Sequence, residues 1–200
     1  IEMGAARGIN FASTKYSIDM NQVVKFKDGV VKRLTMGVEA LLKSNGVDVF
    51  RGVAKINKNK DVVVDGNRII LAGGSKVSRI NIPGIDNPRI LSSDELLSLK
   101  EVPETLTVIG GGVIGVEMAL AMHAIGSKVT IVEMMDRIVP AIDSEASKVL
   151  ADTLKKKGIK ILNSVSIVGI EEAKNKLQVK LANGEVIESD KALLSIGRVP

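Results

Sequence analysis

The sequence predicts an α/β fold in which helices cover both faces of an open, largely parallel β-sheet. Three observations predict it. An apolar strand at Thr105–Ile109 runs into the glycine-rich turn Gly110–Gly115, which has the form G-x-G-x-x-G. An apolar helix follows, and then a second strand, Lys128–Val132, which ends at Glu133. Helices and strands continue to alternate after it, and short β-like runs near the end of the chain indicate an antiparallel insertion.

Each glycine of this turn has a mechanical role. Gly110 permits the tight turn from strand to helix, Gly112 lets a diphosphate approach the backbone, and Gly115 lets the helix pack close to the strand. The free N–H groups and the positive end of the helix dipole then face the phosphates. The sequence therefore predicts a Rossmann-like unit that binds a dinucleotide.

Glu133 indicates which dinucleotide is bound. It lies 23 residues after Gly110 (133 − 110), near the ~20 expected for the acid that accepts hydrogen bonds from the adenosine ribose. A carboxylate here repels a 2′-phosphate, and no cation follows it before Arg137. We therefore expect NAD rather than NADP. The alternative is that Glu133 only ends a strand at the surface.

The composition limits the classes of function that remain. The chain has 200 residues, enough for one large or two small domains, and 45% hydrophobic with 26% charged residues is ordinary for a globular protein. The net charge is +5, and Lys155–Lys157 is interpreted as the end of a helix before Gly158. One Tyr, three Phe and no Trp leave few side chains on which bases could stack. No apolar run reaches the ~18 residues of a membrane span, so we expect no nucleic-acid or membrane partner.

Metal and thiol chemistry are also limited by composition. The chain has no cysteine, which excludes disulfides, thiolate nucleophiles and thiolate metal sites within it. His123 is the single histidine and lies mid-helix after the glycine turn, where we expect a packing or surface role.

The first part of the chain is predicted to hold one amphipathic helix and several short strands. Apolar residues recur at steps of three and four from Asp19, a candidate N-cap, to a stop at Asn45-Gly46, so we expect a helix whose apolar stripe lies in a core. We place a domain boundary between Ser75 and Lys76, because residues 76–88 have linker composition. The strands expected before it are Val47–Ile56, Asp61–Asp65 and Arg68–Ala72, the last two joined at Gly66-Asn67 and the last apolar on both faces like a central strand.

The second part is predicted to begin with a short helix at Ser93–Leu99 and to contain the β-α-β unit at Thr105–Glu133. A further helix, from about Asp143 to Lys157, leads into the strand Ile159–Leu162. The remaining expected strands are Val165–Ile170, Leu177–Leu181, Val186–Glu188 and Ala192–Ile196, with a hairpin turn at Asn183-Gly184.

Several segments spread over most of the chain resemble the flavoprotein disulfide reductases, and within them the dihydrolipoyl dehydrogenases. These segments are Lys27–Leu34, Asn81–Asp86, Gly110–Glu117, Ile138–Pro140 with Asp143, and Ser195–Pro200. The resemblance implies an FAD domain, an NAD domain inserted into it and a dimerisation domain. It also implies a flavin-dependent oxidoreductase, in which dihydrolipoamide and NAD⁺ give lipoamide and NADH through a redox disulfide and FAD.

The resemblance also implies roles for individual residues. It assigns the diphosphate of NAD to the glycine turn, the nicotinamide end to Glu117, the adenosine ribose to Glu133, an adenine-side contact to Ile167 and a backbone contact to Gly197. The expected NAD residues are Gly110, Gly111, Gly112, Val113, Ile114, Gly115, Glu117, Glu133, Ile167 and Gly197. The residues implied on the flavin side are Ala54, Gly73, Gly74, Ser75 and Arg198. Residues 1–75 then form a partial FAD-binding segment, and residues 76–200 form the NAD-binding domain.

The sequence also departs from the family pattern. The upstream FAD-binding glycine motif, the redox cysteine pair and the C-terminal His–Glu pair have no counterpart here, and Gly73 stands where Thr is common. We therefore expect a fragment, inactive alone and without catalytic or metal-binding residues, of a cytoplasmic homodimer. Its expected partners are NAD, NADH and the lipoyl groups of 2-oxoacid dehydrogenase or glycine cleavage complexes. Two alternatives stay open: another branch of the mercuric reductase, NADH peroxidase or transhydrogenase type, or a standalone NAD-binding module without redox chemistry.

Overall fold

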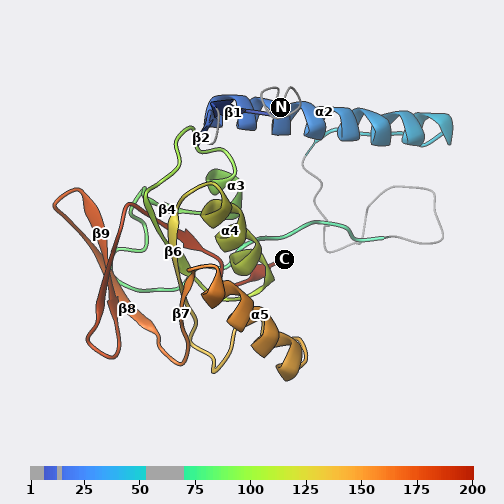
Figure 1. The fold of residues 1–200 in the computed structure, drawn as a ribbon. Helices are drawn as coiled ribbons and strands as arrows, with labels where there is room; N and C mark the ends of the chain where they lie inside the picture. Colours follow the sequence, from blue (N-terminus) through green and yellow to red (C-terminus); the bar gives the residue numbers. More distant parts are fainter. Residues whose placement is uncertain (1–6, 13–14, 53–69) are drawn as a thin grey trace.

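A computed structural model describes residues 7–12, 15–52 and 70–200 (Figure 1). Its centre is a five-stranded, all-parallel sheet in the order β4-β11-β5-β6-β7. The bounds are β4 Ile90–Leu91, β5 Thr105–Ile109, β6 Lys128–Val132, β7 Lys160–Leu162 and β11 Lys191–Leu194. The predicted Rossmann-like, largely parallel sheet is therefore confirmed.

Three helices pack on one face of this sheet. They are α3 (Ser93–Leu96, with Ser92 as its N-cap), α4 (Val113–Ala124) and α5 (Ser144–Lys156, with the predicted Asp143 as its N-cap). Leu106 and Val108 of β5 point to this face, in one cluster with buried side chains of all three helices. The neighbouring Ile109 points to the opposite face, as strand alternation requires.

A second, antiparallel sheet covers that opposite face, in the order β10-β9-β8. Its strands are β8 Ile167–Ala173, β9 Lys176–Leu181 and β10 Val186–Ser189, which confirms the predicted insertion. Leu177, Val179 and Leu181 of β9 are buried against Ile109 and its neighbours. The expectation of helices on both faces is wrong in this respect, because the chain crosses from β7 to β11 through hairpins that cover the face a helix would take.

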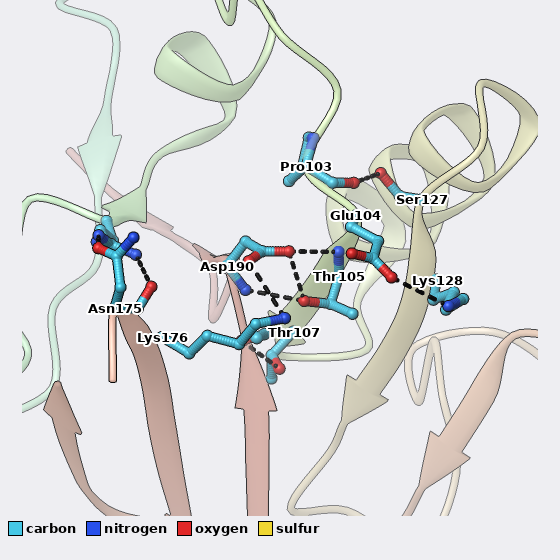
Figure 2. Close-up of polar contacts among 11 residues, drawn as sticks. Pro103, Glu104, Thr105, Thr107, Ser127, Lys128, Asn175, Lys176 and Asp190 are labelled. Atoms are coloured by element: carbon cyan, nitrogen blue, oxygen red, sulfur yellow. Dashed lines mark hydrogen bonds and ion pairs between the residues drawn. The ribbon is translucent and has the colours of Figure 1, made fainter. Parts of the chain in front are cut away.

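Asp190, between β10 and β11, ties the two sheets together at the amino end of β5 (Figure 2). Its Oδ2 accepts hydrogen bonds from the Thr105 backbone N (2.9 Å) and Oγ1 (2.7 Å), and its Oδ1 lies 3.4 Å from Lys176 Nζ. Burial alone would raise the pKa of Asp190, but the Thr105 hydrogen bonds and Lys176 outweigh it and hold the pKa below its usual value. Next to this cluster, the buried hydroxyls of Thr107 and Ser189 share a 3.0 Å hydrogen bond.

The predicted first helix is confirmed as α2, Met20–Ser44, with Asp19 as its N-cap and Asn45 as its C-cap. The expectation that its stripe lies in a core is wrong for the described chain, because Val31, Leu34 and other apolar residues of α2 are more than half exposed. In Figure 1 the helix runs clear of the central sheet. Before it, β1 (Ile9–Ala12) and β2 (Lys15–Ile18) form an antiparallel pair that the sequence did not reveal.

The strands expected between α2 and residue 75 are not confirmed. Residues 47–52 and 70–75 have no regular structure, and Ile70 and Leu71 are 90% and 77% exposed rather than central in a sheet. A central strand needs a partner on each edge, and the described residues supply none there. The remainder of those runs, the Gly66-Asn67 turn and Ala54 lie outside the described residues.

The linker region does contain a tertiary pairing. β3 (Lys76–Val77) and β12 (Arg198–Val199) form a short antiparallel ladder, so the start and the end of residues 76–200 lie side by side. The domain boundary between Ser75 and Lys76 stays a prediction.

None of the helices in the described ranges combines the length and apolarity needed to cross a bilayer.

Candidate dinucleotide site

The glycine turn joins β5 to α4 at the carboxyl edge of the parallel sheet. Gly110 has φ +100°, and a Cβ built there would lie 2.6 Å from the Ser195 carbonyl oxygen. A Cβ at Gly115 would lie 2.1 Å from the Gly110 carbonyl oxygen. Both positions therefore require glycine, as the sequence predicted. A Cβ at Gly112, in contrast, would meet nothing within 4 Å, so the missing side chain leaves the approach to the turn open.

The first turn of α4 presents unpaired backbone donors to this opening. Gly112 is the N-cap and makes no side-chain capping bond. The first hydrogen bond of the helix is donated by the Val116 N–H to the Gly112 carbonyl, at 3.0 Å. Within the described ranges, the amides of Gly112, Val113 and Ile114 have no protein acceptor. Three convergent N–H groups at the positive end of a helix dipole suit a diphosphate.

Glu133 follows β6 and lies directly beside the turn. Its Oε2 accepts a hydrogen bond from the Gly111 N–H at 2.6 Å, and its Oε1 accepts one from the Met135 N–H at 2.8 Å. The residue is only 7% exposed, so the alternative of a surface strand end is wrong. A carboxylate offers about four lone-pair sites, so each oxygen can still accept one more hydrogen bond, such as one from a ribose hydroxyl.

Gly111 is held from two sides and faces the protein. Its N–H is bound by Glu133, and its carbonyl accepts a 2.7 Å hydrogen bond from the Val139 N–H. Val139 is buried and has φ +41°, a conformation that is uncommon for a β-branched residue. The peptide of Gly111 is therefore committed to shaping the turn.

A cavity of about 690 Å³ opens in front of the turn and is walled mainly by apolar side chains. Its volume is within the range of small-molecule and cofactor sites. Of the ten expected NAD residues, it is lined by Gly110, Gly112, Val113, Ile114, Glu133, Ile167 and Gly197. Gly111 and Gly115 are buried behind that lining, and Glu117 is exposed on α4 and is not part of it.

Sequence reasoning missed a larger part of the cavity wall, namely Ile80, Ile82, Ile109, Val132, Met134, Met135, Pro140, Val165, Ser166, Ser195 and Ile196. Some of these had a signal, because Met134 and Met135 directly follow Glu133 and Ile196 precedes Gly197. Ile80 had none, and Ile82 lies in the resembling segment Asn81–Asp86, to which no role in the site was assigned. They belong to the linker-like stretch, and only tertiary contacts bring them to the cavity.

The residues expected on the flavin side are not gathered into this cavity. Arg198 binds Ser75 instead, with Nε 2.8 Å from Ser75 Oγ and Nη2 2.6 Å from the Ser75 carbonyl oxygen. Gly73 and Gly74 are exposed, and a Cβ at either would meet nothing within 4 Å. Within the part of the chain that the structure describes, no group of three or more His, Cys, Asp or Glu residues is arranged to hold a metal ion.

Comparison with known proteins shows to which family this chain belongs. The family model described as "Pyridine nucleotide-disulphide oxidoreductase" matches residues 4–200. The chain belongs to this family. A dihydrolipoyl dehydrogenase of Acholeplasma laidlawii is 40% identical over 195 residues, which is 92% of this chain and 57% of that protein. One from Chlamydia pneumoniae is 37% identical over 92% of this chain and 41% of that protein. The chain thus spans about half the length of these relatives.

Solved structures of other family members show the same fold. An HOCl-induced flavoprotein disulfide reductase from Escherichia coli is 34% identical, with a TM-score of 0.60 over 64% of this chain and 29% of that one. A water-forming NADH oxidase from Lactobacillus brevis, bound to NADH, is 28% identical, with a TM-score of 0.60 over 64% of this chain and 30% of that one. These neighbours confirm the predicted fold class and the predicted family.

Proposed function

We propose that this chain is the NAD-binding part of a dihydrolipoyl dehydrogenase, a flavin-dependent enzyme that oxidises dihydrolipoamide and reduces NAD⁺. The observation that carries the proposal is the meeting of the unpaired amides of Gly112, Val113 and Ile114 with the Glu133 carboxylate at one apolar cavity. The 34–40% identity to dihydrolipoyl dehydrogenases supports the choice of branch.

The residues that line the cavity fit NAD in one orientation. The three amides would bind the diphosphate, and Glu133 would accept hydrogen bonds from the adenosine ribose. The adenine would lie toward Met135 and Ile167, and the nicotinamide end toward Gly197 and the linker isoleucines. Bound NAD supplies a hydride acceptor, while the apolar wall keeps water away and fixes its orientation.

A pair of structural neighbours supports NAD over NADP. A mutant of the Lactobacillus brevis enzyme, 25% identical to this chain with a TM-score of 0.60, is described as an engineered water-forming NADPH oxidase bound to NADPH. Its substitutions replace an Asp and the two residues after it, a Pro seven positions after the Asp, and a Gly eighteen positions before it. At the same spacing this chain has the acid Glu133, Met135, Pro140 (140 − 133 = 7) and Gly115 (133 − 115 = 18), with Met134 where the parent of that mutant has Ala.

FAD as second cofactor and lipoyl groups as substrate are proposed from the family and from the names of the relatives. The homodimer, the cytoplasmic location and the division into residues 1–75 and 76–200 stay proposals from the sequence. Gly73, Gly74, Ser75 and Arg198 do not by themselves form a cradle for a flavin, since the glycines are exposed and Arg198 is bound to Ser75.

The test is a titration of the 200-residue chain with NADH, monitored by NADH fluorescence, for the unchanged chain and for Gly112→Val. A Cβ at residue 112 meets nothing within 4 Å, and the extended backbone there (φ −70°, ψ −177°) is one that valine adopts, so the variant should unfold at nearly the same temperature. It should nevertheless bind NADH at least tenfold more weakly, because the new methyl groups occupy the approach of the diphosphate. Undiminished NADH binding by a folded Gly112→Val variant would place the ligand elsewhere.

A further inference from the structure

Ser195 carries a buried hydroxyl at the base of the glycine turn and has no role among the expected site residues. It follows β11, which neighbours β5, and is 8% exposed. Its Oγ lies 2.9 Å from the Gly110 carbonyl oxygen and 3.0 Å from the Ile109 carbonyl oxygen, and donates its one proton between them.

The two carbonyls depend on this hydroxyl to different degrees. The Ile109 carbonyl also accepts the Ser195 backbone N–H at 2.8 Å. For the Gly110 carbonyl, the Ser195 hydroxyl is the donor found among the described residues. This carbonyl is wedged against α4, as the 2.1 Å approach of a Gly115 Cβ indicates, so it has little room to find another donor in place.

We propose that Ser195 is a positioning residue for the diphosphate site. Its hydroxyl holds the Gly110 carbonyl, and thereby fixes the direction of the amides of Gly112, Val113 and Ile114. Without the hydroxyl, the Gly110 carbonyl turns toward the open cavity to find water, and rotation of this peptide displaces the amides that follow it. The inference rests on the proposed NAD function and deepens it.

The chain offers a matched control for the loss of a buried serine hydroxyl. Ser189 is 1% exposed, and its hydroxyl pairs with Thr107 in the middle of β5, before the glycine turn. Ser189→Ala therefore removes a comparable hydrogen bond without touching the glycine turn. If Ser195 mattered only for stability, Ser195→Ala and Ser189→Ala would lower the unfolding temperature and alter ligand binding alike.

The experiment compares the binding of NADH, ADP and adenosine by the unchanged chain, Ser195→Ala and Ser189→Ala. Adenosine carries the base and the ribose but no phosphate. We expect Ser195→Ala to weaken the binding of NADH and of ADP about tenfold, in line with the loss of a hydrogen bond. The binding of adenosine should weaken less than about twofold. Ser189→Ala should leave all three affinities unchanged. Equal weakening of all three ligands by Ser195→Ala, or no weakening, would overturn the proposal.

Two further measurements keep the outcomes separate. In the ligand-free chain, the amide chemical shifts of Gly112–Ile114 should change in Ser195→Ala and stay the same in Ser189→Ala. Unchanged shifts in Ser195→Ala would overturn the proposal even if the NADH affinity fell. If the shifts move but the unchanged chain binds no NADH, the proposed function fails and the positioning of the turn stands. Ser195→Cys keeps the volume but donates weakly, so its affinities should lie between the other two. Full affinity in that variant would exclude the hydrogen bond as the cause.

Discussion

Glu133 is predicted to support both the ligand-free turn and the bound dinucleotide, so its replacement should have two separable effects. In Glu133→Ala the amides of Gly111 and Met135 each lose a charged acceptor, at 2.6 Å and 2.8 Å, in a place that is 7% exposed. A hydrogen bond to a charged group contributes about 1.5–3 kcal/mol, so two lost bonds set an upper range of about 3–6 kcal/mol. Local relaxation and the entry of water reduce this cost. We therefore expect a loss of about 2–3 kcal/mol in the free energy of unfolding.

The assay is urea denaturation of the ligand-free chain, followed by NADH titration of the same preparations. Glu133→Gln is the matched variant, because its amide oxygen can still accept from one of the two N–H groups, and it should lose about half as much stability. NADH affinity should fall in both variants, since the ribose loses a charged acceptor worth about 1.5–3 kcal/mol. Glu117→Gln, exposed on α4, is the control and should leave stability unchanged. A Glu133→Ala chain as stable as the original would show that the two hydrogen bonds of Glu133 do not support the turn, and an unchanged NADH titration would show that Glu133 does not contact the ribose.

Two further predictions follow from the site and from the sheet junction. Replacing Glu133, Met134, Met135 and Pro140 by Ala, Arg, Ser and Arg, with Gly115 kept because a Cβ there would press on the Gly110 carbonyl, should reverse the preference from NADH to NADPH in parallel titrations; a folded variant that still prefers NADH would contradict the ribose assignment. Asp190 has a pKa below its ordinary value of 3.8 in the folded chain, so its ionised form contributes stability that is present above pH 3.8 and is lost as the pH falls below it. The difference in unfolding free energy between the unchanged chain and Asp190→Asn should therefore shrink in acid denaturation below pH 3.8, and a constant difference would count against the Thr105 and Lys176 contacts.

The parts of the fold that the sequence predicts well are those decided by local chemistry. The glycine turn and the apolar runs beside it determine β5, α4 and β6, because Gly110 adopts a φ of +100° that favours glycine and Gly115 packs on the carbonyl of Gly110, five residues before it. Asp19 and Asp143 mark helix starts for the same local reason, since their carboxylates accept backbone N–H groups of the first turn.

The errors concern features that depend on distant segments. Arg68–Ala72 has the pattern of a central strand, but pattern alone does not supply the neighbouring strands, and Ile70 is exposed. Helices were expected on both faces of the sheet, yet the hairpin β8–β9 covers one of them through pairing that the sequence period does not encode. The linker isoleucine Ile80 reaches the cavity because residues 76 and 77 pair with 198 and 199, a contact across more than a hundred residues.

The proposed function requires that the amides at the start of α4 bind the diphosphate of NAD. Titration of the isotope-labelled 200-residue chain with NAD⁺, followed by amide chemical shifts, measures this contact residue by residue. We expect the largest shift changes at Gly112, Val113 and Ile114, and smaller ones at Gly111 and Met135 beside Glu133. Saturable NAD⁺ binding that leaves these five amides unmoved, or no binding at all, would contradict the proposed function.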